Sequence, residues 1–139
     1  MTETTPDAVR AWCQDAGNRI DAANALVEEA LPALKAAVHE AAREQAEASG
    51  IPEAVLDVWV ASLLIEGVSL LRDHLAGEAE AAGYPVGVIG ATVGQGSTSN
   101  TRRALPLMRK AAEARRAADL TGVAVPLSTP TWRIDVTPL

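Results

Sequence analysis

Hydrophobic side chains recur with the three-to-four-residue period of a helix over most of the chain, and this pattern predicts a mainly helical protein. The first helix is expected over residues 6–16, where Thr5 can cap its start and Gly17 its end. Pro6 fits the first helical position. A long helix is expected over residues 19–48. Pro32 should kink it, because proline lacks the N–H that a helix interior needs.

One stripe of side chains in the helix expected over 19–48 repeats in steps of four and three residues, as in a coiled-coil seam. Asn24 lies on this stripe and would need a polar partner if it were buried. The stripe consists of Ile20, Asn24, Val27, Leu31, Leu34, Val38, Ala41 and Gln45.

A third helix is expected over residues 52–82, and apolar residues occupy most of its circumference. It is therefore predicted to be the central helix, surrounded by its neighbours. Glu66 is expected to be a solvent-facing or interface carboxylate and not a catalytic acid. Charged and polar residues interrupt the apolar stretch, so a membrane span is not expected. The polar strip of this helix consists of Ser62, Glu66, Ser69 and Asp73.

Glycines and β-branched residues alternate over residues 84–98, which predicts a loop or a small hairpin. A last, basic helix is expected over about 101–119, with N-cap candidates in 97–101. Pro106 lies inside it and should set its first turn apart.

The last twenty residues, 120–139, break the helical pattern. They contain three prolines, and Trp132, Ile134 and Val136 alternate with Arg133 and Asp135, which is the two-residue period of a strand. No hairpin partner is expected next to this strand. The segment is therefore predicted to be an extended arm whose apolar face docks on another subunit.

Charge is unevenly distributed along the chain. Five basic and 15 acidic residues precede Arg102, whereas seven basic and three acidic residues follow from Arg102 onward. Two solvated faces would explain this asymmetry, and so would acidic and basic ends that meet between identical subunits in a head-to-tail ring. The net charge of −6 opposes direct binding to duplex nucleic acid.

No set of residues predicts catalysis, a cofactor or a metal. The glycine segment lacks the lysine of a phosphate-binding loop. His39 and His74 lack the glutamate three positions earlier that a helical di-iron site uses. The single cysteine, Cys13, excludes an internal disulfide and is expected to be a small apolar group. No basic, apolar leader precedes the first helix, so secretion is not expected.

The basic helix is the remaining charged feature. Arg109 has Glu113 four residues later, and Arg115 has Asp119, so part of its charge is matched within the helix. Arg102 and Arg103 have no local partner. They could contact acidic residues of a neighbouring subunit, or nucleic acid passing close by.

The order of these elements resembles that of phage head-to-tail adaptor proteins (head–tail connectors) of the small helical, ring-forming type. The resemblance rests on the helix PDAVRAWC, the proline-containing helix ALVEEALPALKAAV, and the apolar helix VWVASLLIEGVSLLRDHL. The glycine-rich insertion, the stretch ALPLMRKA and the extended tail complete it. The long tail and the glycine segment depart from the simplest members.

The resemblance implies a non-enzymatic virion protein at the head–tail junction, assembled in the host cytoplasm. It would form a homo-oligomeric ring, possibly a dodecamer, that contacts the portal and the tail or stopper proteins. DNA would pass through the channel without specific binding. The alternatives are another small tail-completion protein, or a helical regulatory or nucleic-acid-associated module that uses the basic helix 102–116.

The expected organisation is an all-α bundle of about four helices over residues 1–119, with the loop or hairpin 84–98, and a docking arm over 120–139. The expected partner interface consists of Trp132, Ile134, Val136, Arg102, Arg103 and Arg109.

Overall fold

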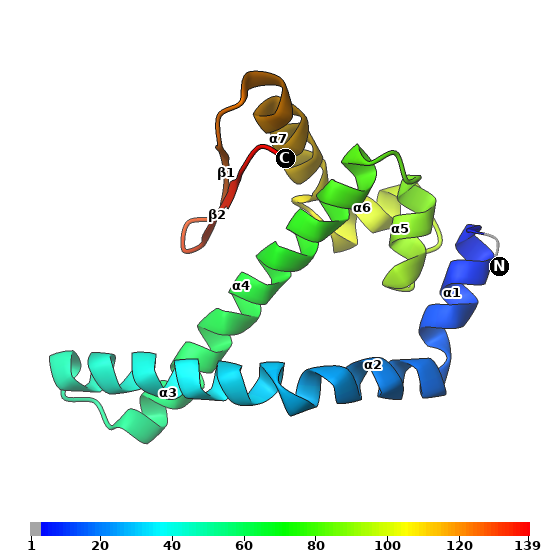
Figure 1. The fold of residues 1–139 in the computed structure, drawn as a ribbon. Coiled ribbons are helices and arrows are strands. Elements are labelled where there is room, and N and C mark those ends of the chain that lie inside the picture. Colours follow the sequence, from blue (N-terminus) through cyan, green and yellow to red (C-terminus); the bar gives the residue numbers. More distant parts are fainter. Residues whose placement is uncertain (1–3) are drawn as a thin grey trace. The chain divides into compact units, whose positions relative to one another are not determined.

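The computed structural model describes residues 4–139. These are mostly helical, as the sequence pattern predicts, and they also contain one small sheet (Figure 1). The chain divides into two compact units. The central unit is Ala16–Val68, and the terminal unit combines the residues up to Asp15 with Ser69–Leu139. The elements are α1 (Pro6–Gln14), α2 (Ala16–Glu28), α3 (Ala30–Ser49), α4 (Glu53–Ala81), α5 (Val86–Thr92), α6 (Thr98–Ala104), α7 (Met108–Thr121), β1 (Val125–Ser128) and β2 (Arg133–Val136).

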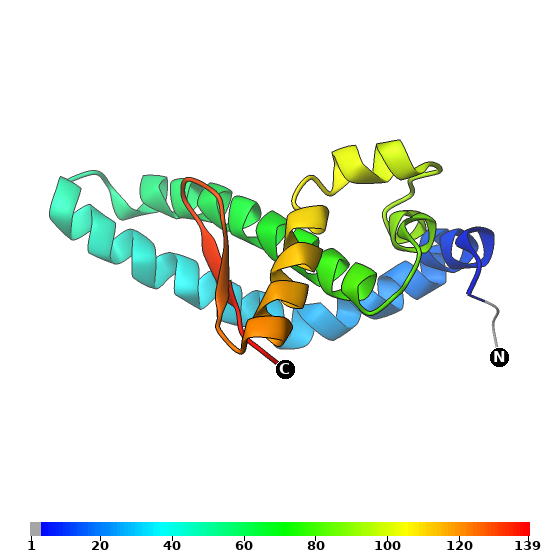
Figure 2. The same cartoon turned by 90° about the horizontal axis from the view of Figure 1, so that it is seen from above.

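The central unit contains α2, α3 and the first half of α4. α3 and this half of α4 lie side by side in Figure 2, and a hydrogen bond between His39 and Asp57 joins them. Ala42 and Leu56 are its buried apolar residues. The helix expected over 19–48 is divided at Glu29, three residues before Pro32. Proline cannot donate to the carbonyl four residues earlier, so the predicted break falls where that hydrogen bond is missing.

The start of α1 is as predicted, because the Thr5 hydroxyl accepts a hydrogen bond from the Ala8 N–H at 3.2 Å. Its predicted end is wrong. α1 stops at Gln14 with Asp15 as its C-cap, and Gly17 lies inside α2.

The terminal unit packs α7 closely against the second half of α4. A side chain at Gly77 would meet the Cβ of Ala111 and would lie 2.7 Å from the backbone nitrogen of Ala112. Two clusters of buried residues result from this packing. One is centred on Leu70, Ala111, Ala114, Ala118, Leu127 and Val136, and the other on Ala76, Ile89, Leu105 and Met108.

The prediction of a loop or hairpin over 84–98 is wrong, because residues 86–92 form the helix α5. Gly90 is buried in this helix, and a Cβ at that position would collide with Thr101 of α6. Gly94 takes the left-handed conformation, with φ 77°, after the helix ends. The glycines therefore permit close helix packing and one turn.

The prediction that the tail strand has no hairpin partner is also wrong. β1 and β2 pair antiparallel, with Val125 opposite Val136 and Leu127 opposite Ile134. Pro126 lies in β1, which it can do because both strands of a two-stranded sheet are edge strands. A hydrogen bond stabilises the turn between β1 and β2. In it, the Thr129 hydroxyl accepts from the Trp132 N–H at 2.9 Å.

Candidate functional site

The apolar face predicted on the tail strand exists, but it faces this chain's own core. Val136 is 1% exposed, and Trp132 and Ile134 are half-buried against the cluster that contains Leu70 and Ala118. The Nε1 atom of Trp132 is buried and has no hydrogen-bond partner in the described part of the chain. The strand is therefore not a free arm in this subunit. A docking role for its half-buried residues stays a prediction.

Arg115 ties the tail to the helices. Its guanidinium donates to both carboxylate oxygens of Glu78, at 2.6 and 2.7 Å, to Asp119 at 3.1 Å and to the carbonyl of Thr137 at 2.6 Å. These hydrogen bonds lower the pKa of Glu78, against the opposing effect of burial, and the Arg115 pKa is raised by the same pair. The pKa of Asp119 is lowered first by the backbone N–H of Leu139, which lies 3.0 Å from its Oδ1.

The three arginines predicted at a partner interface have different environments. Arg102 is not free, because it makes two hydrogen bonds to Glu80, at 2.7 and 3.1 Å, that raise its pKa. Arg109 forms the expected helical pair with Glu113 at 3.6 Å. Arg103 is exposed and forms no ion pair within residues 4–139. The sequence could not reveal the Glu80 partner, which precedes Arg102 by 22 residues.

The polar strip predicted on α4 is divided between solvent and core. Ser62 and Glu66 are exposed, whereas Asp73 is 3% exposed. The Asp73 carboxylate accepts hydrogen bonds from the Leu107 N–H at 3.0 Å and from Arg72 at 3.2 Å. It therefore satisfies a backbone donor at the start of α7, as a buried carboxylate should.

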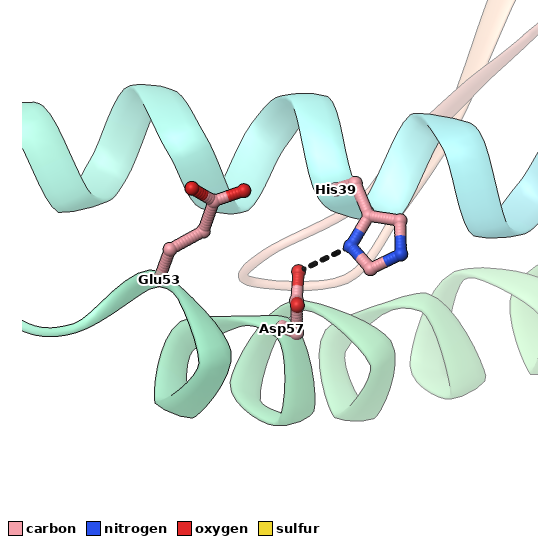
Figure 3. Close-up of side chains that lie close together, drawn as sticks. All are labelled: His39, Glu53 and Asp57. Carbon is pink, nitrogen blue, oxygen red and sulfur yellow. Dashed lines mark hydrogen bonds and ion pairs between the residues drawn. The ribbon is translucent and has the colours of Figure 1, made fainter.

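Three possible metal ligands meet on the central unit, although the sequence predicted none. His39 of α3 and Asp57 of α4 are joined by a hydrogen bond, with Nδ1 and Oδ1 2.9 Å apart (Figure 3). The carboxylate of Glu53 lies one helical turn before Asp57, and the three donor atoms lie within 4.8 Å of one another. Sequence spacing relates His39 only to residues of its own helix, and Glu53 and Asp57 lie on the facing helix. The pair Glu53 and Asp57, four residues apart, was the available signal.

The largest unexplained feature is the exposed apolar surface of α4. The prediction that neighbours surround this helix is wrong within the central unit, since Val58 and Ile65 are each 69% exposed. Val55, Trp59, Val68, Leu71 and Leu75 are 45–59% exposed. Among the described helices, α4 is the one long and apolar enough to cross a membrane, with a mean hydropathy of 1.9 in its most apolar window.

The seam predicted along 19–48 is covered at one end. Ala42, beside the seam, is fully buried and Val38 is half-buried. Exposure rises toward the N-terminus, through 38% at Leu34 to 56% at Leu31. Ile20 and Val27 in α2 are 59% and 51% exposed. Most of the seam is therefore not covered by the other helices of the central unit.

Comparison of the chain with protein-family models, with curated proteins and with solved structures finds no match.

Proposed function

We propose that this protein is a non-enzymatic assembly subunit, a phage head-to-tail adaptor that forms a ring between portal and tail around the DNA channel. The observation that carries the proposal is the exposed apolar surface of α4 and α2. Isolated apolar side chains are common on protein surfaces, but many large apolar residues exposed on the same helices favour an interaction site. In an assembly protein, such a face would be buried against a neighbouring subunit.

The bundle of about four helices belongs to this proposal as a feature of the assembled ring. The central unit contributes a hairpin of α3 and α4 with few buried side chains. A neighbouring subunit would supply the remaining helices and bury the exposed apolar residues.

In this proposal the tail takes part in attachment as a folded hairpin, and not as the free extended arm expected from the sequence. Its hairpin has two outer edges, and an extended segment of a portal or tail protein can add to such an edge by strand pairing. Arg133 and Asp135 point away from the core at the β2 edge and pair with each other at 2.7 Å. Attachment would therefore use the hairpin as a folded element.

The test is co-assembly with the proteins encoded by the neighbouring genes, among which the proposal expects a portal and a tail protein. Mixed and examined by native mass spectrometry, the chain is expected to give a stable complex with at least one of them. Absence of any complex with each neighbour, under conditions where the chain is folded, would overturn the adaptor proposal.

The nucleic-acid alternative rests on the exposed basic residues of α6 and α7. Arg103, Lys110 and Arg116 form no ion pairs within the described chain, whereas Arg102, Arg109 and Arg115 pair with carboxylates. A nucleic-acid module should bind duplex DNA with an affinity that falls steeply with salt. The adaptor proposal expects weak duplex binding in a titration at 50 and 200 mM salt.

A further inference from the structure

We propose that two copies of the chain pair through the outer edge of β2, so that their hairpins form one four-stranded antiparallel sheet. The contact lies within the terminal unit and goes beyond the proposed function. The inference names the edge that pairs, the register of the pairing and a second copy as the partner. A portal or tail strand that adds to the same edge would have to displace that second copy.

The hydrogen-bond ladder within the hairpin decides which backbone groups face outward. In an antiparallel pair of strands, opposite residues alternate between pairs that exchange hydrogen bonds and pairs that do not. The N–H of Thr129 donates to the carbonyl of Trp132 at 2.8 Å, so this pair is a bonded one. Alternation along the register then leaves two pairs whose N–H and C=O groups point to the outer edges of the hairpin. These are Pro126 with Asp135 and Ser128 with Arg133.

The two outer edges differ in what they offer to a further strand. Pro126 has no N–H, so the edge of β1 lacks a donor, and a proline is a common protection of an edge strand. The edge of β2 offers the N–H and C=O groups of Arg133 and Asp135. Both residues are exposed, and these outward groups have no hydrogen-bond partner within residues 4–139. The edge of β2 is therefore the one that is open to strand pairing.

The sequence of β2 is complementary to itself when two copies run antiparallel about Ile134. This register places Arg133 of each copy opposite Asp135 of the other, and Ile134 opposite its equivalent. The outward N–H and C=O groups of Arg133 and Asp135 then form the hydrogen-bonded pairs, as the alternation requires. One step farther along, Trp132 of each copy lies opposite Val136 of the other, on the apolar side of the sheet. Opposite charges and apolar pairs across strands both stabilise such a sheet.

Charge complementarity favours a second copy as the occupant of this edge. A matching strand needs an acid opposite Arg133, an apolar residue opposite Ile134 and a base opposite Asp135, and β2 carries these three in reverse order. Within one strand the side chains of Arg133 and Asp135 pair at 2.7 Å and stay 64% and 52% exposed, so both are accessible to a partner. The terminal unit carries nine basic and nine acidic residues, so its net charge does not oppose the contact.

The first experiment measures the dimer by sedimentation velocity of the full chain at several concentrations. Arg133→Glu and Asp135→Arg each place like charges opposite each other twice in the contact. Each should raise the dissociation constant at least about tenfold. The chain that carries both changes restores opposite charges across the strands and should dimerise as the wild type does. Arg103→Glu is the matched control, because it makes the same charge change at an exposed arginine outside the hairpin.

Mixing the two single variants tests the register. In a heterodimer of Arg133→Glu with Asp135→Arg, every charged residue of one β2 strand lies opposite an opposite charge of the other. The equimolar mixture should therefore form a heterodimer about as tightly as the wild-type chain forms its dimer, and native mass spectrometry separates the species by mass. A mixture that associates no better than the single variants would overturn the proposed register.

Amide hydrogen exchange followed by NMR locates the contact. The outward N–H groups of Arg133 and Asp135 are bonded only in the dimer, so their exchange should slow as the protein concentration rises. The N–H of Ser128 points outward at the β1 edge and is the internal control, because its exchange should stay fast at every concentration. Protection of Ser128 without protection of Arg133 and Asp135 would overturn the choice of the β2 edge.

Two further outcomes overturn the inference itself. One is a wild-type chain that stays monomeric at tens of micromolar, and the other is a double variant that dimerises no better than either single variant. Circular dichroism should show unchanged structure in each variant, since the altered side chains are exposed. A chain that dimerises in this way yet binds no portal or tail protein would refute the proposed function and leave the contact established. A monomer that binds such a protein would do the reverse.

Discussion

Arg115 is the residue on which most of the terminal unit's polar contacts converge. It is 8% exposed and joins α4, α7 and the end of the tail through Glu78, Asp119 and the carbonyl of Thr137. The spacing of four residues predicted its pair with Asp119. Glu78 could not be predicted, because it lies 37 residues earlier on another helix and the sequence does not specify which helix faces which.

Arg115→Ala should therefore destabilise the protein by about 3 kcal/mol, because it leaves a partly buried carboxylate without its partner. The free energy of unfolding in urea measures this. Arg109→Ala is the control. It removes an exposed helical pair and should cost less than about 0.5 kcal/mol. Equal losses in the two variants would contradict the central role of Arg115.

The lowered pKa values of Glu78 and Asp119 predict a loss of stability in acid. A carboxyl whose pKa is lower in the folded state contributes fully above its unfolded pKa, about 4. That contribution disappears as the pH falls through the lower folded value. The free energy of unfolding should thus be constant from pH 7 to about 5 and then fall. A Glu78→Gln variant, less stable at pH 7, should show a shallower fall, and an identical slope would contradict this.

The His39–Asp57 pair accounts for the geometry near Glu53 without a metal. A single exposed hydrogen bond contributes about 0.5–1.5 kcal/mol, so His39→Ala should lower stability only slightly. Equimolar zinc should leave the thermal midpoint of the wild-type protein unchanged in a calorimetric scan. A rise of several degrees that disappears in Glu53→Gln would instead show that these three residues bind the ion.

At the scale of elements, helix starts and ends near proline and serine were predictable, and contacts between helices were not. Ser97 caps α6 by accepting a hydrogen bond from the Asn100 N–H at 3.1 Å, and the chain separates α6 from α7 around Pro106. The loop or hairpin predicted over 84–98 was wrong because the sequence does not distinguish a glycine needed for close helix packing from one needed for a turn.

Gly77→Ala tests close packing directly. The added Cβ would collide with Ala111 and crowd the backbone of α7, so we expect destabilisation of about 1–3 kcal/mol despite the better helix propensity of alanine. Gly96→Ala is the control, since nothing lies within 4 Å of a Cβ there. Thermal unfolding followed by circular dichroism compares them, and a stabilised Gly77→Ala would contradict the packing.

At the scale of the whole molecule, the exposed apolar surface decides the interpretation, and it could not be predicted from the sequence. The sequence pattern of α4 places apolar residues around most of its circumference. Periodicity cannot tell which element packs on each side of a helix, and many of these side chains are exposed in the structure.

Removal of residues 126–139 should weaken the terminal unit and not simply detach an arm. The deletion takes away Leu127 and Val136, which are 3% and 1% exposed, and this burial contributes about 3–6 kcal/mol. Urea unfolding should shift to lower concentration. Val123→Ala, at a 65% exposed position, should change little. A truncated chain with wild-type stability would show that the tail is only an attachment.

The discontinuity of the terminal unit has a consequence during synthesis. α1 packs on α5, and Arg10 donates to the carbonyl of Gln95 at 3.1 Å, although the whole central unit lies between them in the chain. The N-terminal helix therefore leaves the ribosome long before its binding site exists. It must wait until α5 and residue 95 have emerged, so this unit can close only after the whole central unit has been synthesised.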